Sequence, residues 1–222
     1  MLEFPSFSFQ TWRPRLDGVA LTGGQSTSNT VQTVKTDGGG RWLFEMGDSN
    51  LNQVQSLKLW RAYEALLDGG ATEVILKLCD RRQSTGWPYV IVDNVPHDDD
   101  TLFDDDTGYS QESTSPIYAG AAALRATSMS VNSDSLIAPG EHFSIEHPTA
   151  GWRLYRVGAR DGAVITFRPP LREAIAAGTF LETEQPRCVV RQIDASSFAP
   201  AVTRHRYAKG SAAFMESFDY AN

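Results

Sequence analysis

The close spacing of strand-like segments and turn residues is what most constrains the fold of residues 120–222. Short runs of alternating or β-branched residues recur here, and Pro139-Gly140 and Asp161-Gly162 stand between them as turn signals. Short strands at close spacing with frequent turns are typical of sandwiches and barrels. The sequence therefore predicts a compact all-β C-terminal module over residues 120–222.

Residues 1–92 are expected to form a second β module, and this one contains a helix. Apolar residues fall near helical spacing over residues 51–67, and Asn50 followed by Gln53 resembles a capping box. A glycine pair at 69–70 is placed to end the helix. The expected fold class is thus mainly β, with two β-sandwich or barrel-like modules and one substantial helix in the first.

Two strand patterns flank this helix in the sequence. "NTVQTVKTDGGGRWLFEM", residues 29–46, predicts a hairpin with Asp37 to Gly40 as its turn. No Lys-Ser/Thr pair follows the glycines, so they do not form a phosphate-binding loop. "TEVILKLC", which follows the helix, predicts a buried strand. At the start of the chain, Phe7 and Phe9 are spaced to share one face of an extended segment.

The acidity of the chain is confined to one stretch. The formal net charge is −7, and residues 93–112 hold eight acidic residues without a Lys or Arg. Subtracting the −8 of this stretch leaves +1 for the remainder, which lacks the clustered Lys and Arg of a nucleic-acid surface.

We expect residues 93–119 to be an acidic loop or linker between the modules. Asp98 to Asp100 and Asp104 to Asp106 do not follow the alternate spacing of an EF-hand loop. A solvated excursion is favoured over a looser calcium site. The stretch could face a partner, a lumen, an ion or solvent, and the sequence leaves these alternatives open.

A search for catalytic patterns finds none. The chain has no GxSxG, HExxH or GxGxxG motif, and no Cys/His group with zinc spacing. We therefore predict no catalytic residue, no cofactor and no metal site, and regard a hydrolase with an unrecognised site as the weakest hypothesis. The two cysteines, Cys79 and Cys188, are expected to be buried thiols. The four histidines, His97, His142, His147 and His205, are expected to lie on the surface or to be partly buried.

The stretch "FRPPLREAIAAGTFLE", residues 167–182, is interpreted as a connector between two strands. Pro169 and Pro170 are expected to stop the first strand, because proline cannot donate to a ladder. "LREAIAAG" predicts one or two helical turns ended by Gly178. We expect Arg168, Pro169 and Leu171 to fix the geometry of this connector by packing and capping.

Several ordered landmarks resemble the tail proteins of long-tailed bacteriophages (siphoviruses) and related gene transfer particles. They are "DGVALTGGQSTSNTVQTVKTDGGGRW", "LWRAYEALLDGG", "VILKLCDRRQ", "ALRATSMSV", "APGEHFSI", "WRLYRV", "FRPPLREAIAAGT", "PRCVVRQI" and "FMESF". The resemblance covers most of the chain and is weak around residues 88–115. It resides in the order and spacing of the segments, since no single one is diagnostic.

The resemblance implies a structural role in the virion tail, most like a distal tail or baseplate protein. Such proteins are built on β-sandwich modules and form homo-oligomeric rings, typically hexamers, between the tail tube protein and the tip or hub proteins. On this expectation residues 1–92 form the ring, and DNA passes through its lumen without specific binding. An acidic lining at 93–112 would repel the phosphates.

The alternative is a carbohydrate-binding β-sandwich protein of the tail tip, used in host attachment. Aromatic side chains form such platforms, although packing in the core is the simpler role. The tryptophans concerned are Trp12, Trp42, Trp60, Trp87 and Trp152.

Location follows from the same patterns. The chain contains no apolar run of about 18 residues, and "MLEFPSFSFQTW" lacks the basic start and apolar core of a signal peptide. We expect synthesis in the cytoplasm of the host bacterium, no membrane insertion, and a final place in the virion.

Overall fold

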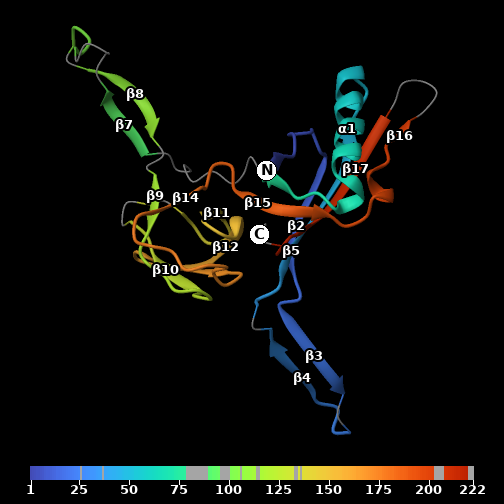
Figure 1. The fold of residues 1–222 in the computed structure, drawn as a ribbon. Coiled ribbons are helices and arrows are strands. Elements are labelled where there is room, and N and C mark those ends of the chain that lie inside the picture. The colour runs from blue at the N-terminus through green and yellow to red at the C-terminus, as the bar shows by residue number, and fades with distance from the viewer. Residues whose placement is uncertain are drawn as a thin grey trace.

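The fold is mainly β, as the sequence predicts, with one α-helix and several sheets (Figure 1). The computed structural model describes residues 1–25, 27–36, 38–78, 90–95, 101–105, 107–113, 116–132, 135, 137–202 and 208–219. Cys79, Trp87, His97, Asp98 to Asp100 and His205 lie outside these residues.

The larger sheet has seven strands in the order β1-β6-β15-β17-β5-β2, with β16 pairing to β17. Only the β1–β6 pair is parallel. The strands are β1 (Leu2–Glu3), β6 (Val74–Lys77), β15 (Arg187–Gln192), β17 (Ala208–Glu216), β5 (Arg41–Asn50), β2 (Thr11–Asp17) and β16 (Ala201–Val202).

The smaller sheet has four strands in the order β10-β13-β12-β11, and a two-stranded sheet β14-β9 lies beside it. The expected turns at Pro139-Gly140 and at Asp161-Gly162 are confirmed. The strands are β10 (Ser128–Ser130), β13 (Val164–Arg168), β12 (Gly151–Asp161), β11 (His142–His147), β14 (Thr179–Leu181) and β9 (Ile117–Ala119).

The two sheets do not follow the expected division of the chain at residues 92 and 120. Strands β15 and β17 belong to the segment 120–222, yet they pair with β6 and β5 of the segment 1–92 in one sheet. The chain therefore runs from the larger sheet to the smaller one and back again. A local strand pattern predicts an extended segment, but it carries no information about the distant strand with which the segment pairs.

The helix α1 (Val54–Leu66) lies within the expected range of 51–67 but does not have the expected capping box. Gln53 stands at its N-cap without a side-chain hydrogen bond. Asn50 is instead the last residue of β5, where it pairs with Lys209 of β17, and its Oδ1 accepts the N–H of Asn52 at 3.1 Å. The 3₁₀ turn η1 (Asp68–Gly70) follows the helix, with both glycines at positive φ.

Aromatic side chains fill the core beneath the helix. Trp60 is fully buried and stacks on Phe198 of the 3₁₀ turn η2 (Ser196–Phe198), with ring centroids 4.3 Å apart. Its Nε1 donates to the carbonyl oxygen of Phe198 at 2.7 Å. Phe7 packs its ring against the same tryptophan, and Phe9 lies beside it, so the two share one face as predicted, although their segment forms no strand.

The expected hairpin over residues 29–46 is wrong. The strand β4 (Val31–Lys35) pairs with β3 (Ala20–Gln25), whereas β5 pairs with β2 and β17. The chain from β2 to β3 and the chain from β4 to β5 are the two sides of one antiparallel ribbon, because β2 pairs with β5 and β3 pairs with β4. The β3–β4 part of this ribbon extends beyond the sheet (Figure 1). Gly38 to Gly40 join two sections of this ribbon and do not form its turn.

The connector at 169–178 contains no helix, so the expected helical turns are wrong. Its backbone pairs with a distant segment: Leu171 donates its N–H to Ala126 and accepts from Arg125, both at 2.9 Å. Leu171 is buried in the core of the smaller sheet, and Gly178 has a positive φ of 83°, as expected for a turn-ending glycine.

Within the acidic stretch, β7 (Val90–Val95) and β8 (Tyr109–Ser113) form an antiparallel hairpin. Figure 1 shows this hairpin projecting from the body of the protein, in a different direction from the β3–β4 hairpin.

Candidate functional site: an exposed arm and the buried ion cluster at its base

The β3–β4 hairpin, which we call the arm (residues 20–35), is exposed along its whole described length. Leu21, Val31 and Val34 are 68%, 52% and 60% exposed. The outer edges of β3 and β4 pair with no other strand of the described chain. Isolated two-stranded hairpins are marginally stable in water. The arm therefore offers both apolar side chains and open strand edges to a partner.

Glycines permit a tight crossing of the chain at the base of the arm. Gly18, Gly39 and Gly40 all have positive φ values, between 67° and 82°. A Cβ at Gly40 would lie 2.2 Å from the carbonyl oxygen of Asp17, and one at Gly39 would lie 2.1 Å from Pro170. Only glycine fits these positions without a shift of the backbone or of the connector.

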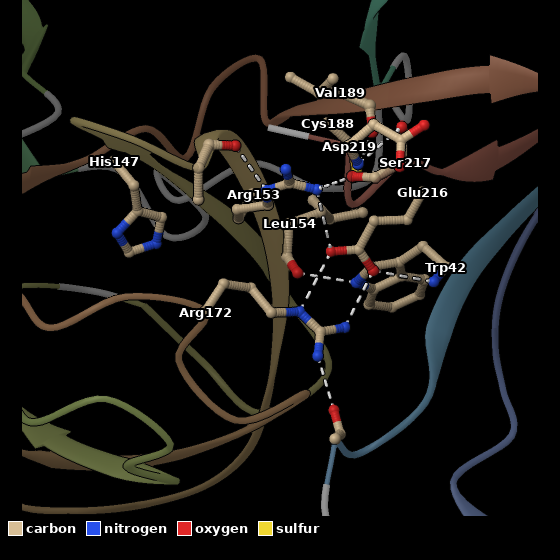
Figure 2. A network of polar contacts seen from close by, with 12 residues as sticks. Trp42, His147, Arg153, Leu154, Arg172, Cys188, Val189, Glu216, Ser217 and Asp219 are labelled. Atoms are coloured by element: carbon tan, nitrogen blue, oxygen red, sulfur yellow. Dashed lines mark hydrogen bonds and ion pairs between the residues drawn. The ribbon is translucent and has the colours of Figure 1, made fainter. Parts of the chain in front are cut away.

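A buried ion cluster, made of Glu216, Arg153 and Arg172, lies next to this base (Figure 2). The Glu216 side chain is fully buried. Its carboxylate lies 3.0 Å from Nη2 of Arg172 and 3.6 Å from Nη1 of Arg153. It also accepts the backbone N–H of Trp42 at 3.1 Å. Burying a carboxylate is tolerable only with such partners.

Three different elements bring the cluster together. Glu216 ends β17 on the inward face that also carries Ala212 and Phe214. Arg153 comes from β12 of the smaller sheet, and Arg172 comes from the connector after β13. The larger sheet supplies the negative charge of the cluster, and the smaller sheet with its connector supplies the two positive charges. The cluster therefore joins the two sheets.

Arg172 also connects the cluster to the arm. Its Nη1 donates to the carbonyl oxygen of Gly38 at 2.6 Å, and its Nη2 donates to that of Gly40 at 2.7 Å. Its guanidinium lies 4.8 Å from the ring centroid of Phe218. One side chain thus fixes the chain at the base of the arm and the carboxylate of β17.

The second arginine satisfies backbone carbonyls on the other side of the cluster. Nε of Arg153 donates to the carbonyl oxygen of Ala150 at 2.7 Å, and its Nη1 donates to that of Ser217. Two guanidinium groups surround one carboxylate, so these carbonyl contacts help to stabilise the additional positive charge.

A buried histidine and tyrosine lie beside the cluster. The hydroxyl of Tyr155 lies 2.8 Å from Nε2 of His147 and accepts the backbone N–H of Arg172 at 3.1 Å. Burial lowers the pKa of His147 to about 4, while the nearby carboxylate of Glu173 opposes this. His147 is therefore neutral at pH 7. Burial likewise raises the pKa of the Tyr155 hydroxyl above its ordinary value.

The described cysteine and the two described histidines lie in the core, which corrects the expectation that the histidines lie on the surface or are only partly buried. Cys188 is a buried free thiol, as predicted, and burial raises its pKa. His142 is buried with its ring 5.6 Å from that of Trp42. Among the described residues, no group of three or more His, Cys, Asp or Glu side chains is placed to hold a metal.

The tryptophans do not form an exposed platform where they are described. Trp42 and Trp60 are fully buried, and each donates its indole N–H to a backbone carbonyl at 2.7 Å. Trp12 and Trp152 are partly buried, and the guanidinium of Arg187 covers the ring of Trp152 at 4.9 Å.

Sequence reasoning did not identify the ion cluster or the arm. In an extended strand Glu216 falls on the same side as Ala212 and Phe214, which is a usable signal of a buried charge. Arg153 and Arg172 gave no such signal, because their partner is distant in sequence.

No helix in the described part of the chain has the length and hydrophobicity needed to cross a membrane. No protein-family model matches the chain, and no curated protein shows significant sequence similarity to it.

Proposed function

We propose that this chain is a structural subunit of the tail of a long-tailed bacteriophage or gene transfer particle. Within the tail it acts as a distal tail or baseplate protein that forms a ring where the tube meets the tip. The observation that carries the proposal is the arm. It is a β-hairpin continuous with two strands of the larger sheet, and it has no covering layer among the described residues. The order of the sequence landmarks provides independent support.

The arm suits a head-to-tail assembly. In such an assembly one face of each subunit contacts a different face of its neighbour, and rings form when the rotation closes. An uncovered hairpin supplies one of the two faces, and pairing with a neighbour would cover Leu21, Val31 and Val34. The proposed ring is hexameric, contacts the tail tube protein on one side and the tip or hub proteins on the other, and lets DNA pass without specific binding.

Removing the arm tests this role. The N–H of Thr36 donates to the carbonyl oxygen of Val19 at 2.9 Å, which is the spacing that a two-residue turn closes. Replacing residues 20–35 by Asn-Gly should leave a folded chain that keeps the far-ultraviolet β signal of the remaining strands. In light scattering after size exclusion, the wild type should have the mass of a ring and the shortened chain that of a monomer.

Particles made without the chain provide the direct test. We expect negative-stain images to show tails that lack a normal tip, and supplying the wild-type chain should restore it. Intact tails with normal tips would refute the proposed role, whatever the oligomeric state of the isolated protein.

One observation keeps carbohydrate binding as a second candidate. Tyr118 of β9 and Phe180 of β14 are directly paired, exposed, and have ring centroids 6.1 Å apart. Exposed aromatic faces can stack on sugars. Glycan-array binding that is lost on combining Tyr118→Ala with Phe180→Ala, but kept in the exposed control Leu124→Ala, would favour this function. A wild type that binds no glycan would exclude it.

A further inference from the structure

A cavity of about 520 Å³ lies beside the base of the arm. It is formed by both ends of the arm, the turn around Arg125 and the connector that carries Arg172. Leu124 and Phe218, both exposed, give part of its wall an apolar surface. The cavity is thus built by segments that are distant in the sequence and that only the fold brings together.

The charge of this cavity is positive. Arg41, Arg125 and Arg172 line it, and Asp17 is the one acidic side chain among its described lining residues. Arg172 faces Glu216, whereas Arg41 and Arg125 are exposed. The cavity therefore combines apolar walls with guanidinium groups, which is the chemistry that binds a carboxylate next to an apolar side chain.

The tip of the β7–β8 hairpin presents the complementary chemistry. Leu102, Phe103, Asp104 and Asp105 are consecutive and all exposed. The N–H of Phe103 donates to the carbonyl oxygen of Thr107 at 2.8 Å, and Oδ1 of Asp105 accepts the Thr107 hydroxyl at 2.5 Å. These bonds link Phe103 and Asp105 to Thr107, and the two apolar residues directly precede the two acidic ones in the sequence.

We propose that the arginine-lined cavity receives the β7–β8 tip of a second copy of this chain, with Asp104 and Asp105 facing Arg41 and Arg125. This inference rests on the proposed ring, and it specifies one of the contacts within it. The tip and the cavity lie on different parts of the surface, and the two hairpins project in different directions (Figure 1). A contact between them is therefore head-to-tail, the kind that closes a ring.

Charge complementarity favours a protein neighbour over a lumen or solvent as the surroundings of the tip. Opposite charges on two contacting faces steer association and fix the register of the contact. The hydrogen bonds from Thr107 lower the pKa of Asp105, so this carboxylate is ionised at neutral pH. Salt should weaken the association, because exposed charges are screened.

Charge exchange in the full-length chain tests the contact. One variant combines Arg41→Glu with Arg125→Glu, and the other combines Asp104→Lys with Asp105→Lys. Each variant alone opposes like charges at every contact. In a 1:1 mixture the two variants can alternate around the ring. Every contact in such a ring then pairs opposite charges. The control Asp161→Lys reverses a charge at the turn of the β12–β13 hairpin, and thermal unfolding of each variant checks that it folds.

Light scattering should give the oligomer mass for the wild type and the control, and the monomer mass for either variant alone. The mixture should recover the oligomer mass. The inference fails if either variant assembles as the wild type does, or if the wild type is monomeric at every concentration. A further variant carries all four substitutions, so that its exchanged cavity and its exchanged tip are on the same chain. The inference also fails if this variant assembles while the mixture does not, because that result indicates a contact within one chain.

Failure of this contact can be told apart from failure of the proposed function. Normal assembly of both variants, together with missing tips in particles that lack the chain, would remove the contact and keep the tail role. Normal tips in those particles would remove the tail role itself.

Discussion

The arm and strand β17 are both extended segments with a β pattern, but they differ in where their polar and apolar groups find partners. β17 is an inner strand, and its single buried carboxylate, Glu216, meets two arginines and a backbone N–H from the same chain. The arm leaves Val31 and Val34 exposed and both outer edges unpaired within the described chain. One region is therefore satisfied within the fold, and the other leaves its apolar side chains and strand edges exposed.

The largest expected effect on the free energy of unfolding is in β17, at its buried carboxylate. Glu216→Ala leaves two buried guanidinium groups without their carboxylate, so the free energy of unfolding should fall by about 3–5 kcal/mol. Glu45 is the control, since it lies 3.3 Å from Arg15 and is half exposed. Glu45→Ala should cost about 1 kcal/mol or less. Urea titration compares the two, and equal losses would mean that the buried cluster contributes no more than a surface pair.

The connector offers the next comparison. Leu171 is buried and its neighbour in the cavity wall, Leu124, is exposed. Leu171→Ala should lower the free energy of unfolding by about 2–5 kcal/mol because it leaves a cavity. Leu124→Ala should change it by about 0.5 kcal/mol or less. Unchanged stability and assembly in Leu171→Ala would refute the view that packing of this side chain holds the connector.

Acid should destabilise the region around the cluster through His147. Its pKa falls from 6.5 in the unfolded chain to about 4 in the folded one, so the unfolded chain binds more protons between these values. The stabilising effect is complete above pH 6.5 and is lost as the pH falls through 4, by about 3 kcal/mol at most.

The carboxylates of the chain titrate in the same pH range as His147. The quantity to measure is therefore the difference in unfolding free energy between the wild type and a variant without this histidine. His147→Gln should lack this contribution, and the gap between its unfolding free energy and that of the wild type should shift between pH 6.5 and pH 4. A gap that stays constant with pH would show that the histidine has the same pKa in both states.

The smallest effect on stability, and the largest on assembly, is expected in the arm. Val31→Lys with Val34→Lys should change the free energy of unfolding by about 0.5 kcal/mol or less, because both side chains are exposed. The same pair should abolish the oligomer. Val164→Lys, at an exposed valine of β13, should affect neither property. Assembly that survives in the arm variant would show that a neighbour does not cover the arm.

Local sequence patterns predicted some of the elements whose partners are near in the chain, but they missed the β3–β4 hairpin. The β12–β13 hairpin formed as expected, because Asp161-Gly162 closes it and its strands are adjacent. The expected hairpin at 29–46 did not form, because β4 pairs with β3 and β5 pairs with β2. The helical turn after Pro170 gave way to hydrogen bonds between Leu171 and residues 125–126.

By itself, the sequence determined the mainly β class and the helix near 51–67. Periodicity and turn residues act over a few positions, and this range is enough to specify extended segments and their faces. The tertiary structure alone decided which strands share a sheet, how Arg153 and Arg172 meet one carboxylate, and that the arm has no cover. These features depend on contacts between segments up to 174 positions apart, as between Trp42 and Glu216, and burial and charge pairing at that range exist only once the chain has folded.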